Sequence, residues 1–471
     1  TIPSSVELIE GNAFSACNEL QNFEISPHSK LKTISEYAFS YSNIFNISIP
    51  SSILNLKCGW CFPTDQFKKI KIIKEKEQNI TFYDDEKYII GKSDKMENVF
   101  DILILVSKNI NSVTIPLFIK QIDPYAFSNS LIENIFIPPH VTCINSFAFS
   151  QCEKIQHVEI SPYSQLRTID SFTFIDSSIE TLTIPPSVSE LKDGWCEGTE
   201  KLTEVIIMPE NPYFKNYEND NQLVIGKSNI DNKEYDILIF ASRKIKEVQI
   251  PPNIKIISSY SFEKSKIEKI FIPKEVIQIG QNAFYDCYHL YNVEIPTDSN
   301  LQTIGMNAFQ STSIERFFIP NQITQIDKST FNDKLKIIEI SNNSKLQILN
   351  KFSFSSSLIE KIFIPRSVKR ICKLSFYKCQ KLQYIDISND SELQFIEKRA
   401  FEKTSIRSFF IPSNVIKIDE SSFESCDNLQ IIEFGENSSI QPFMLSKFKR
   451  TLKYNQNVIF MLPQKFINNF I

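Results

Sequence analysis

The chain has 471 residues, of which 39 are Phe and only 9 are Gly, and its formal net charge is -4. This charge argues against a nucleic-acid-binding protein, because phosphate recognition needs a clustered basic field. Neither end carries a run of about 18 apolar residues, so the sequence predicts no transmembrane helix. The many Ile and Phe residues, on a background of Asn, Lys and Ser, indicate a large core built from small, similar pieces.

Phenylalanine recurs along the chain at steps of 22 to 25 residues. The positions are Phe14 and Phe39, then Phe127, Phe149 and Phe174, and then Phe262, Phe284, Phe309, Phe331, Phe354, Phe376, Phe401 and Phe423. In both early gaps the next position in the series holds Cys, at Cys61 and Cys196, and each Cys follows Trp. A period of 20 to 50 residues is typical of a solenoid, and about 20 turns are expected here.

Two kinds of repeat alternate. The short unit contains Ile314-Glu-Arg-Phe-Phe-Ile-Pro320, and the long unit contains Val293-Glu-Ile-Pro296. The alternation of apolar and other residues predicts a short strand with one buried face. The Pro that follows ends the strand. The segment that closes each unit, such as Ala308-Phe309, suits a helical or 3-10 turn that places the Phe in the core.

A larger duplication includes both irregular parts of the chain. Residues 1–126 match residues 136–261 at an offset of 135, and Ile90-Gly-Lys-Ser93 matches Ile225-Gly-Lys-Ser228. No Gly/Ser-rich or Pro-rich linker occurs, so we predict one continuous solenoid over 1–471. Its predicted parts are regular turns in 1–61, 127–196 and 262–448, irregular hairpin-bearing turns in 62–126 and 197–261, and a degenerate cap or tail in 449–471. The chain begins inside a repeat, so a fragment or a processed product is expected. For this reason the lack of a leader peptide at residue 1 says nothing about the compartment of the protein.

The repeat resembles a known family. The pattern L-x-x-I-x-I-P, S-x-L-x-x-I, A-F-x-x-C/T/S is similar to the BspA-like (treponemal-type) leucine-rich repeats, especially those of surface antigens in parasitic protists. The alternation of a Cys-bearing unit with a Thr-bearing one, as in Cys287 and Thr312, makes the match more specific. The irregular stretches and the tail from about 449 depart from the pattern. The resemblance implies a right-handed, curved leucine-rich-repeat solenoid, with short parallel strands on the concave face and turns, 3-10 segments or short helices on the convex face. It also implies adhesion to host cells or matrix proteins, and it supplies no catalytic residues.

No cysteine pattern predicts a disulfide, a metal site or a redox site. Five Cys share one column of the repeat, at Cys17, Cys152, Cys287, Cys379 and Cys426. A Cys occupies this column at most in every second turn, so successive Cys residues are expected about 10 Å apart or more. This separation is too large for a disulfide, which needs Cα atoms within about 7 Å. These Cys are therefore expected to be buried thiols whose S–H contacts a backbone carbonyl. Cys58-Gly-Trp-Cys61 has redox-like spacing, but its copy reads Asp193-Gly-Trp-Cys196, which favours a structural role.

Other motifs that could carry chemistry are weak. Gly91-Lys92-Ser93 lacks the Gly that a phosphate-binding loop needs five residues earlier, so a hairpin turn is expected. The four His residues, which we expect at the surface, pair with no Cys or carboxylate at ligand spacing: His28, His140, His157 and His289. We therefore predict no enzyme activity, no cofactor and no metal. Asn-x-Ser/Thr sequons, which matter only in a secreted protein, occur at Asn46, Asn79, Asn342, Asn389 and Asn437.

The candidate binding site is the outward face of the strands. The residue between the two buried positions of each strand must point away from the core. In short units it is Ser48, Phe136, Thr183, Phe271, Phe318, Phe363 or Phe410, and in long units it is Glu24, Glu159, Glu294, Glu339, Asp386 or Glu433. Basic residues lie beside the Phe at Lys269, Arg316 and Lys361. The most regular part of this face covers roughly residues 260–435.

Two interpretations of this face remain open. If acidic and apolar residues alternate on successive strands, like charges do not lie opposite each other on adjacent strands, and the pattern then only maintains the sheet. Exposed Phe is also a typical anchor for a protein ligand. The functional hypothesis is a non-enzymatic surface or secreted protein that binds a protein partner, such as a host-cell or matrix component, along the concave face. The alternative is an intracellular scaffold that uses the same face, and a cytoplasmic location stays possible.

Overall fold

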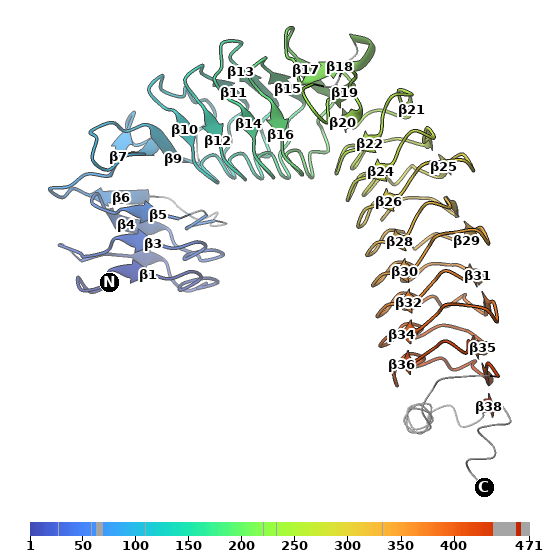
Figure 1. Cartoon of the computed structure of the whole chain (residues 1–471). Helices are drawn as coiled ribbons and strands as arrows, with labels where there is room; N and C mark the ends of the chain where they lie inside the picture. Colours follow the sequence, from blue (N-terminus) through green and yellow to red (C-terminus); the bar gives the residue numbers. More distant parts are fainter. Residues whose placement is uncertain are drawn as a thin grey trace. The chain divides into compact units, whose positions relative to one another are not determined.

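The computed structural model describes residues 1–436, except 27, 58, 63–68, 109, 220, 232 and 332, together with residues 458–462. The chain forms two compact units, Thr1–Asn221 and Gln222–Ile471. Within the described residues it is a parallel β-solenoid of about 18 turns. This confirms the predicted leucine-rich-repeat type of solenoid. Most turns contribute one strand to each of two ladders, a long-strand ladder and a short-strand ladder of two-residue strands (Figure 1).

In the first unit the long-strand ladder contains two sheets, β2-β4-β6 and β11-β13-β15-β17. Their strands are β2 (Asn22–Phe23), β4 (Asn46–Pro50), β6 (Lys69–Ile73), β11 (Asn134–Ile137), β13 (His157–Ile160), β15 (Thr181–Ile184) and β17 (Glu204–Ile207). The short-strand ladder contains β1 (Leu8–Ile9), β3 (Thr33–Ile34), β5 (Asn55–Leu56), β10 (Gln121–Ile122), β12 (Cys143–Ile144), β14 (Thr168–Ile169) and β16 (Glu190–Leu191). The unit also has β7 (Ile80–Tyr83), β8 (Tyr88–Gly91), β9 (Ile102–Val106), β18 (Phe214–Asn216) and the 3-10 segment Tyr217–Asn219.

In the second unit the long strands are β21 (Glu247–Gln249), β23 (Lys269–Phe271), β25 (Asn292–Glu294), β27 (Arg316–Ile319), β29 (Ile337–Ile340), β31 (Lys361–Ile364), β33 (Tyr384–Ile387), β35 (Ser408–Ile411), β37 (Ile431–Phe434) and β38 (Ile459–Met461). The short-strand ladder contains β22 (Ile256–Ile257), β24 (Gln278–Ile279), β26 (Thr303–Ile304), β28 (Gln325–Ile326), β30 (Ile348–Leu349), β32 (Arg370–Ile371), β34 (Phe395–Ile396) and β36 (Lys417–Ile418). The unit begins with β19 (Leu223–Gly226) and β20 (Ile237–Ala241).

The ladders are parallel, and antiparallel pairing occurs in the two irregular stretches. There β8 pairs with both β7 and β9, and β19 pairs with β20. The Gly-Lys-Ser motifs end the strands β8 and β19. The Asp101 carboxylate accepts hydrogen bonds from the backbone N–H and the hydroxyl of Ser93, at 2.9 and 2.8 Å. Asp236 does the same for Ser228, at 2.8 and 2.7 Å. The motif therefore closes a hairpin and does not wrap a phosphate.

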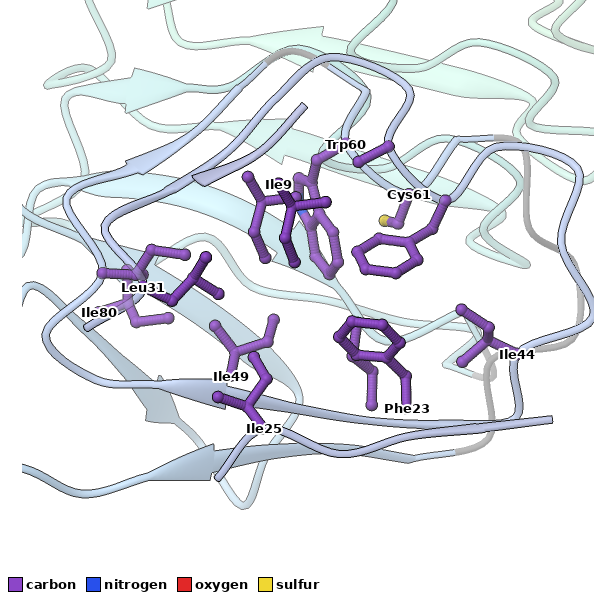
Figure 2. Packing of buried hydrophobic residues seen from close by; sticks show 14 of the residues in the cluster. Ile9, Phe23, Ile25, Leu31, Ile44, Ile49, Trp60, Cys61 and Ile80 are labelled. Carbon is purple, nitrogen blue, oxygen red and sulfur yellow. The ribbon is translucent and has the colours of Figure 1, made fainter. Parts of the chain in front are cut away.

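In the regular turns the core contains a column of stacked Phe rings. In the first unit the ring centroids of Phe149 lie 4.7 Å from Phe127 and 5.4 Å from Phe174. In the second unit the column runs from Phe262 to Phe423, with each ring stacked on the next at 4.8 to 6.4 Å. Figure 2 shows the buried hydrophobic cluster near the start of the chain, which contains Ile9, Phe23, Trp60 and Cys61.

The corner that carries the core Phe is a turn and not a helix. Residues at two positions four apart have left-handed backbone, as at Asn307 with φ 54° and Ser311 with φ 58°. They flank Ala308-Phe309, and a left-handed residue ends a helix. Each corner therefore forms one tight turn, and the described residues contain no α-helix. Short α-helices, which the sequence left possible, do not form at the described corners for that reason, and the one 3-10 segment among the described residues is Tyr217–Asn219.

Some sequence predictions fall outside the described residues. Cys58 and the sequon at Asn437 belong to this group, and so does the predicted tail 449–471 apart from residues 458–462. Within that short stretch β38 pairs in parallel with β37, with Ile459 opposite Ile431 and Met461 opposite Glu433. The long-strand ladder of the second unit therefore includes one strand beyond β37.

Candidate binding face on the long-strand ladder

The structure brings the predicted Phe and acidic residues together in four cross-strand pairs of the second unit. Each Phe on a short-unit strand lies directly opposite an acid on the next long-unit strand: Phe271 opposite Glu294, Phe318 opposite Glu339, Phe363 opposite Asp386, and Phe410 opposite Glu433. We call these eight residues the Phe/acid column. Its register follows from the buried residues on either side of each Phe, such as Phe317 and Ile319, which are 1% and 0% exposed.

The column is accessible, but its Phe residues are not equally exposed. Phe271 keeps 50% of its surface exposed, whereas Phe318, Phe363 and Phe410 are partly buried and less exposed than Phe271. All four acids are exposed. A ring on a flat ladder is partly covered by its neighbours on adjacent rungs, which lie about 4.8 Å away. The Phe faces therefore present apolar surface to a partner without being fully solvated.

The basic residues beside the Phe differ in what they contact. Arg316 forms an ion pair with Glu339 on the neighbouring strand. Lys269 lies over the ring of Tyr291, 5.6 Å from its centroid, and a hydrogen bond to Tyr291 raises the pKa of the lysine. Lys361 is exposed on β31, opposite Tyr384. An exposed ion pair such as Arg316–Glu339 contributes only about 0 to 1 kcal/mol, so it does not close the face to a ligand.

Sequence reasoning missed three exposed apolar residues on the acidic rungs. Ile337 and Tyr384 lie two residues before Glu339 and Asp386, and they are 41% and 52% exposed. Tyr291 precedes β25 and is 48% exposed. The alternation rule that places the acid outward also places the residue two positions earlier outward, so this signal was present for Ile337 and Tyr384. Apolar surface therefore extends beyond the Phe rungs.

The column of cysteines is structural, as the sequence indicated. The Sγ–H groups of Cys152, Cys287, Cys379 and Cys426 donate to the carbonyl of the Phe one turn earlier, at 2.9 to 3.0 Å. Burial raises the pKa of the Cys287 thiol to about 12 and that of Cys152 to about 11. Cys17 is only partly buried. This confirms the expected buried thiols for the four later positions, and such thiols are poor nucleophiles.

The remaining motifs do not assemble into a second kind of site. Cys61 and Cys196 are buried in core positions, 7% and 2% exposed. All four His residues are exposed, as predicted. In the part of the chain that the structure describes, no group of three His, Cys, Asp or Glu residues is placed to hold a metal ion. No helix among those residues has the length and apolar character needed to cross a membrane.

Two parallel strand ladders, with corners that place a Phe in the core of each regular turn, define the class of protein as a leucine-rich-repeat solenoid. The family model described as "BspA type Leucine rich repeat region (6 copies)" matches residues 1–86, 105–225, 236–338 and 347–468, and the chain belongs to this family. Proteins of this class are interaction scaffolds and are generally not enzymes. No curated protein matches the sequence.

Three solved structures of similar fold are bacterial proteins. A leucine-rich repeat protein from Eubacterium ventriosum is 18% identical with a TM-score of 0.54, and the match covers 83% of this chain and 84% of that one. The pneumococcal vaccine antigen PcpA is 17% identical with a TM-score of 0.46, covering 98% and 96%. A leucine-rich cell surface protein from Faecalibacterium prausnitzii is 16% identical with a TM-score of 0.41, covering 91% and 90%.

Proposed function

We propose that this protein binds a protein partner along the Phe/acid column of its second unit. The observation that carries the proposal is the fourfold repetition of an outward Phe directly opposite an outward acid. Aromatic residues supply most of the affinity in protein interfaces, and flanking charges fix the register. Because the rungs are held by backbone hydrogen bonds, little conformational entropy is lost when a partner docks.

The location that fits best is the cell surface or the extracellular space, and the partner is then a host-cell or matrix protein. Membership in the BspA-type family supports this assignment. The alternative is an intracellular scaffold that uses the same column. The exposed sequons at Asn342 and Asn389 distinguish the two in a host that adds N-linked glycans, because only a secreted protein would be modified there.

The test uses the full chain, fluorescently labelled, on a surface coated with a mixture of extracellular-matrix proteins. The triple variant Phe318→Ala, Phe363→Ala and Phe410→Ala is expected to bind at least tenfold more weakly than the wild type. The matched control is Tyr163→Ala, which removes an aromatic residue that is 85% exposed in the first unit. Equal binding of the wild type and the triple variant, with unchanged thermal unfolding, would show that the Phe/acid column only maintains the sheet.

A further inference from the structure

We propose that the first hairpin carries a second docking surface, for a protein segment that combines apolar and basic side chains. The surface has an apolar part, which we call the hairpin patch, made of Tyr83, Leu117 and Phe118. The rings of Tyr83 and Phe118 contact edge to face with their centroids 5.2 Å apart. Each of these two residues is 41% exposed, and Leu117 is 66% exposed. Adjacent exposed aromatic and aliphatic residues are typical of interaction sites.

Strand pairing and hydrogen bonds fix the position of the hairpin patch. Tyr83 ends β7 and pairs with Tyr88 of β8. The Tyr88 hydroxyl donates to the carbonyl of Thr114 at 2.9 Å, which fixes the segment that leads to Leu117. The turn closes with the N–H of Ile119 donating to the carbonyl of Pro116 at 3.0 Å, and Ile119 is fully buried. A partner therefore meets a preorganised surface.

The second copy of the duplicated block shows that the turn does not need these apolar residues. There Pro252 and Asn253 stand where the first copy has Leu117 and Phe118. The same turn forms, with Ile254 N–H donating to the Pro251 carbonyl at 3.1 Å. Before the hairpin tip the second copy aligns with the first at an offset of 132, because Asn79 matches Asn211 and Phe82 matches Phe214. At this offset Lys215 stands in place of Tyr83. The turn therefore does not require Leu117 and Phe118, which leaves their side chains available to bind a partner.

The charges beside the hairpin patch indicate the chemistry of the partner. The tip of the hairpin is Asp84-Asp85-Glu86, and all three residues are exposed. Lys87 pairs with Asp84 at 2.9 Å. No salt bridge among the described residues involves Asp85 or Glu86. Two negative charges next to an apolar surface are complementary to a segment that places an aliphatic or aromatic side chain on the rings and a Lys or Arg at the tip.

The experiment measures binding of a fluorescent hexapeptide of alternating Lys and Leu to the full chain by anisotropy. The control peptide has Glu in place of Lys. We expect saturable binding of the Lys peptide that weakens as salt is raised, and no binding of the Glu peptide. The double variant Tyr83→Lys, Phe118→Asn takes the residues found in the second copy, which the fold accepts. It is expected to weaken binding at least tenfold, and Asp85→Asn with Glu86→Gln at least fivefold.

Two comparisons make the result specific. Tyr163→Lys, a change at an exposed aromatic outside the hairpin patch, should leave binding unchanged. The Phe318→Ala, Phe363→Ala, Phe410→Ala variant should also leave it unchanged, which separates this surface from the Phe/acid column. Absence of binding, equal binding of both peptides, or full binding by the Tyr83→Lys, Phe118→Asn variant would overturn the proposal.

Discussion

The hydroxyl oxygens of Tyr37 and Tyr125 lie 2.9 Å apart, although 88 residues separate them in the sequence. The two rings meet edge to face at one corner of the first unit, with their centroids 6.3 Å apart. Gly59 lies between them, and a Cβ there would be 2.9 Å from a ring carbon of each tyrosine. The corners before and after the first irregular stretch therefore stack closely across Gly59.

The first prediction concerns Gly59. Its φ is +59°, so Gly59→Ala introduces backbone strain as well as contact with both rings. We expect the free energy of unfolding to fall by about 1 to 3 kcal/mol, measured by chemical denaturation. Gly11→Ala is the control, because its added Cβ would meet only the Glu36 carbonyl at 3.2 Å. A smaller loss at Gly59 than at Gly11 would contradict the role of Gly59.

The second prediction concerns Arg243, which is 1% exposed at the start of the second unit. Its Nη1 donates to the Ser261 carbonyl at 3.2 Å, and its guanidinium lies over the Phe240 ring. Arg243→Met keeps much of the volume but removes the charge-assisted hydrogen bond to the Ser261 carbonyl, which contributes about 1.5 to 3 kcal/mol. We expect thermal unfolding at a clearly lower temperature. Lys246→Met, at an exposed position, should change it little.

The third prediction is a pH dependence caused by Asp123. Burial raises the pKa of this carboxyl to about 6. A hydrogen bond from the Gln121 side-chain amide, at 2.7 Å, lowers the pKa but has the smaller effect. The unfolded value is 3.8, so the folded state binds the proton more tightly and loses stability as pH rises from about 4 to about 6.

Asp123→Asn keeps an oxygen for Gln121 and carries no charge. The variant should therefore be more stable than the wild type at pH 8, by roughly 2 kcal/mol, and the difference should shrink toward pH 4. Thermal melts at both pH values measure it. A wild type that is more stable than the variant at pH 8 would show that the carboxylate is favourably solvated in the fold.

The fourth prediction concerns thiol reactivity. Cys152, Cys287 and Cys379 are fully buried, whereas Cys17, Cys143 and Cys372 are only partly buried. Alkylation of the native chain at pH 8, followed by mass spectrometry, should label the second group first. Labelling of the buried group should require unfolding, because burial blocks access of the reagent to those thiols. Burial raises the thiol pKa in both groups, to about 11 for Cys372 as for Cys152, so accessibility decides the order of labelling. Equal labelling rates in the two groups would contradict the assignment.

The sequence alone was sufficient to predict the repeat and the residues that point outward from the strands. Phe at regular steps identified the core column, because a solenoid needs one large apolar residue per turn at the same place. The period of two along Phe317-Phe318-Ile319 identified Phe318 as the outward residue, because strand side chains alternate. Both signals are local, so a single sequence carries them.

Three features were decided only by the tertiary structure. The second ladder is built of two-residue strands such as β30 and β32, which are too short to show periodicity. The contact of Tyr83 with Phe118 joins residues from β7 and a later turn, and no local pattern predicts it. The contact between Tyr37 and Tyr125 depends on the path of the first irregular stretch, which lies between them in the sequence. Local alternation determines which way a side chain points, whereas its neighbour is determined by the packing of turns that are distant in sequence.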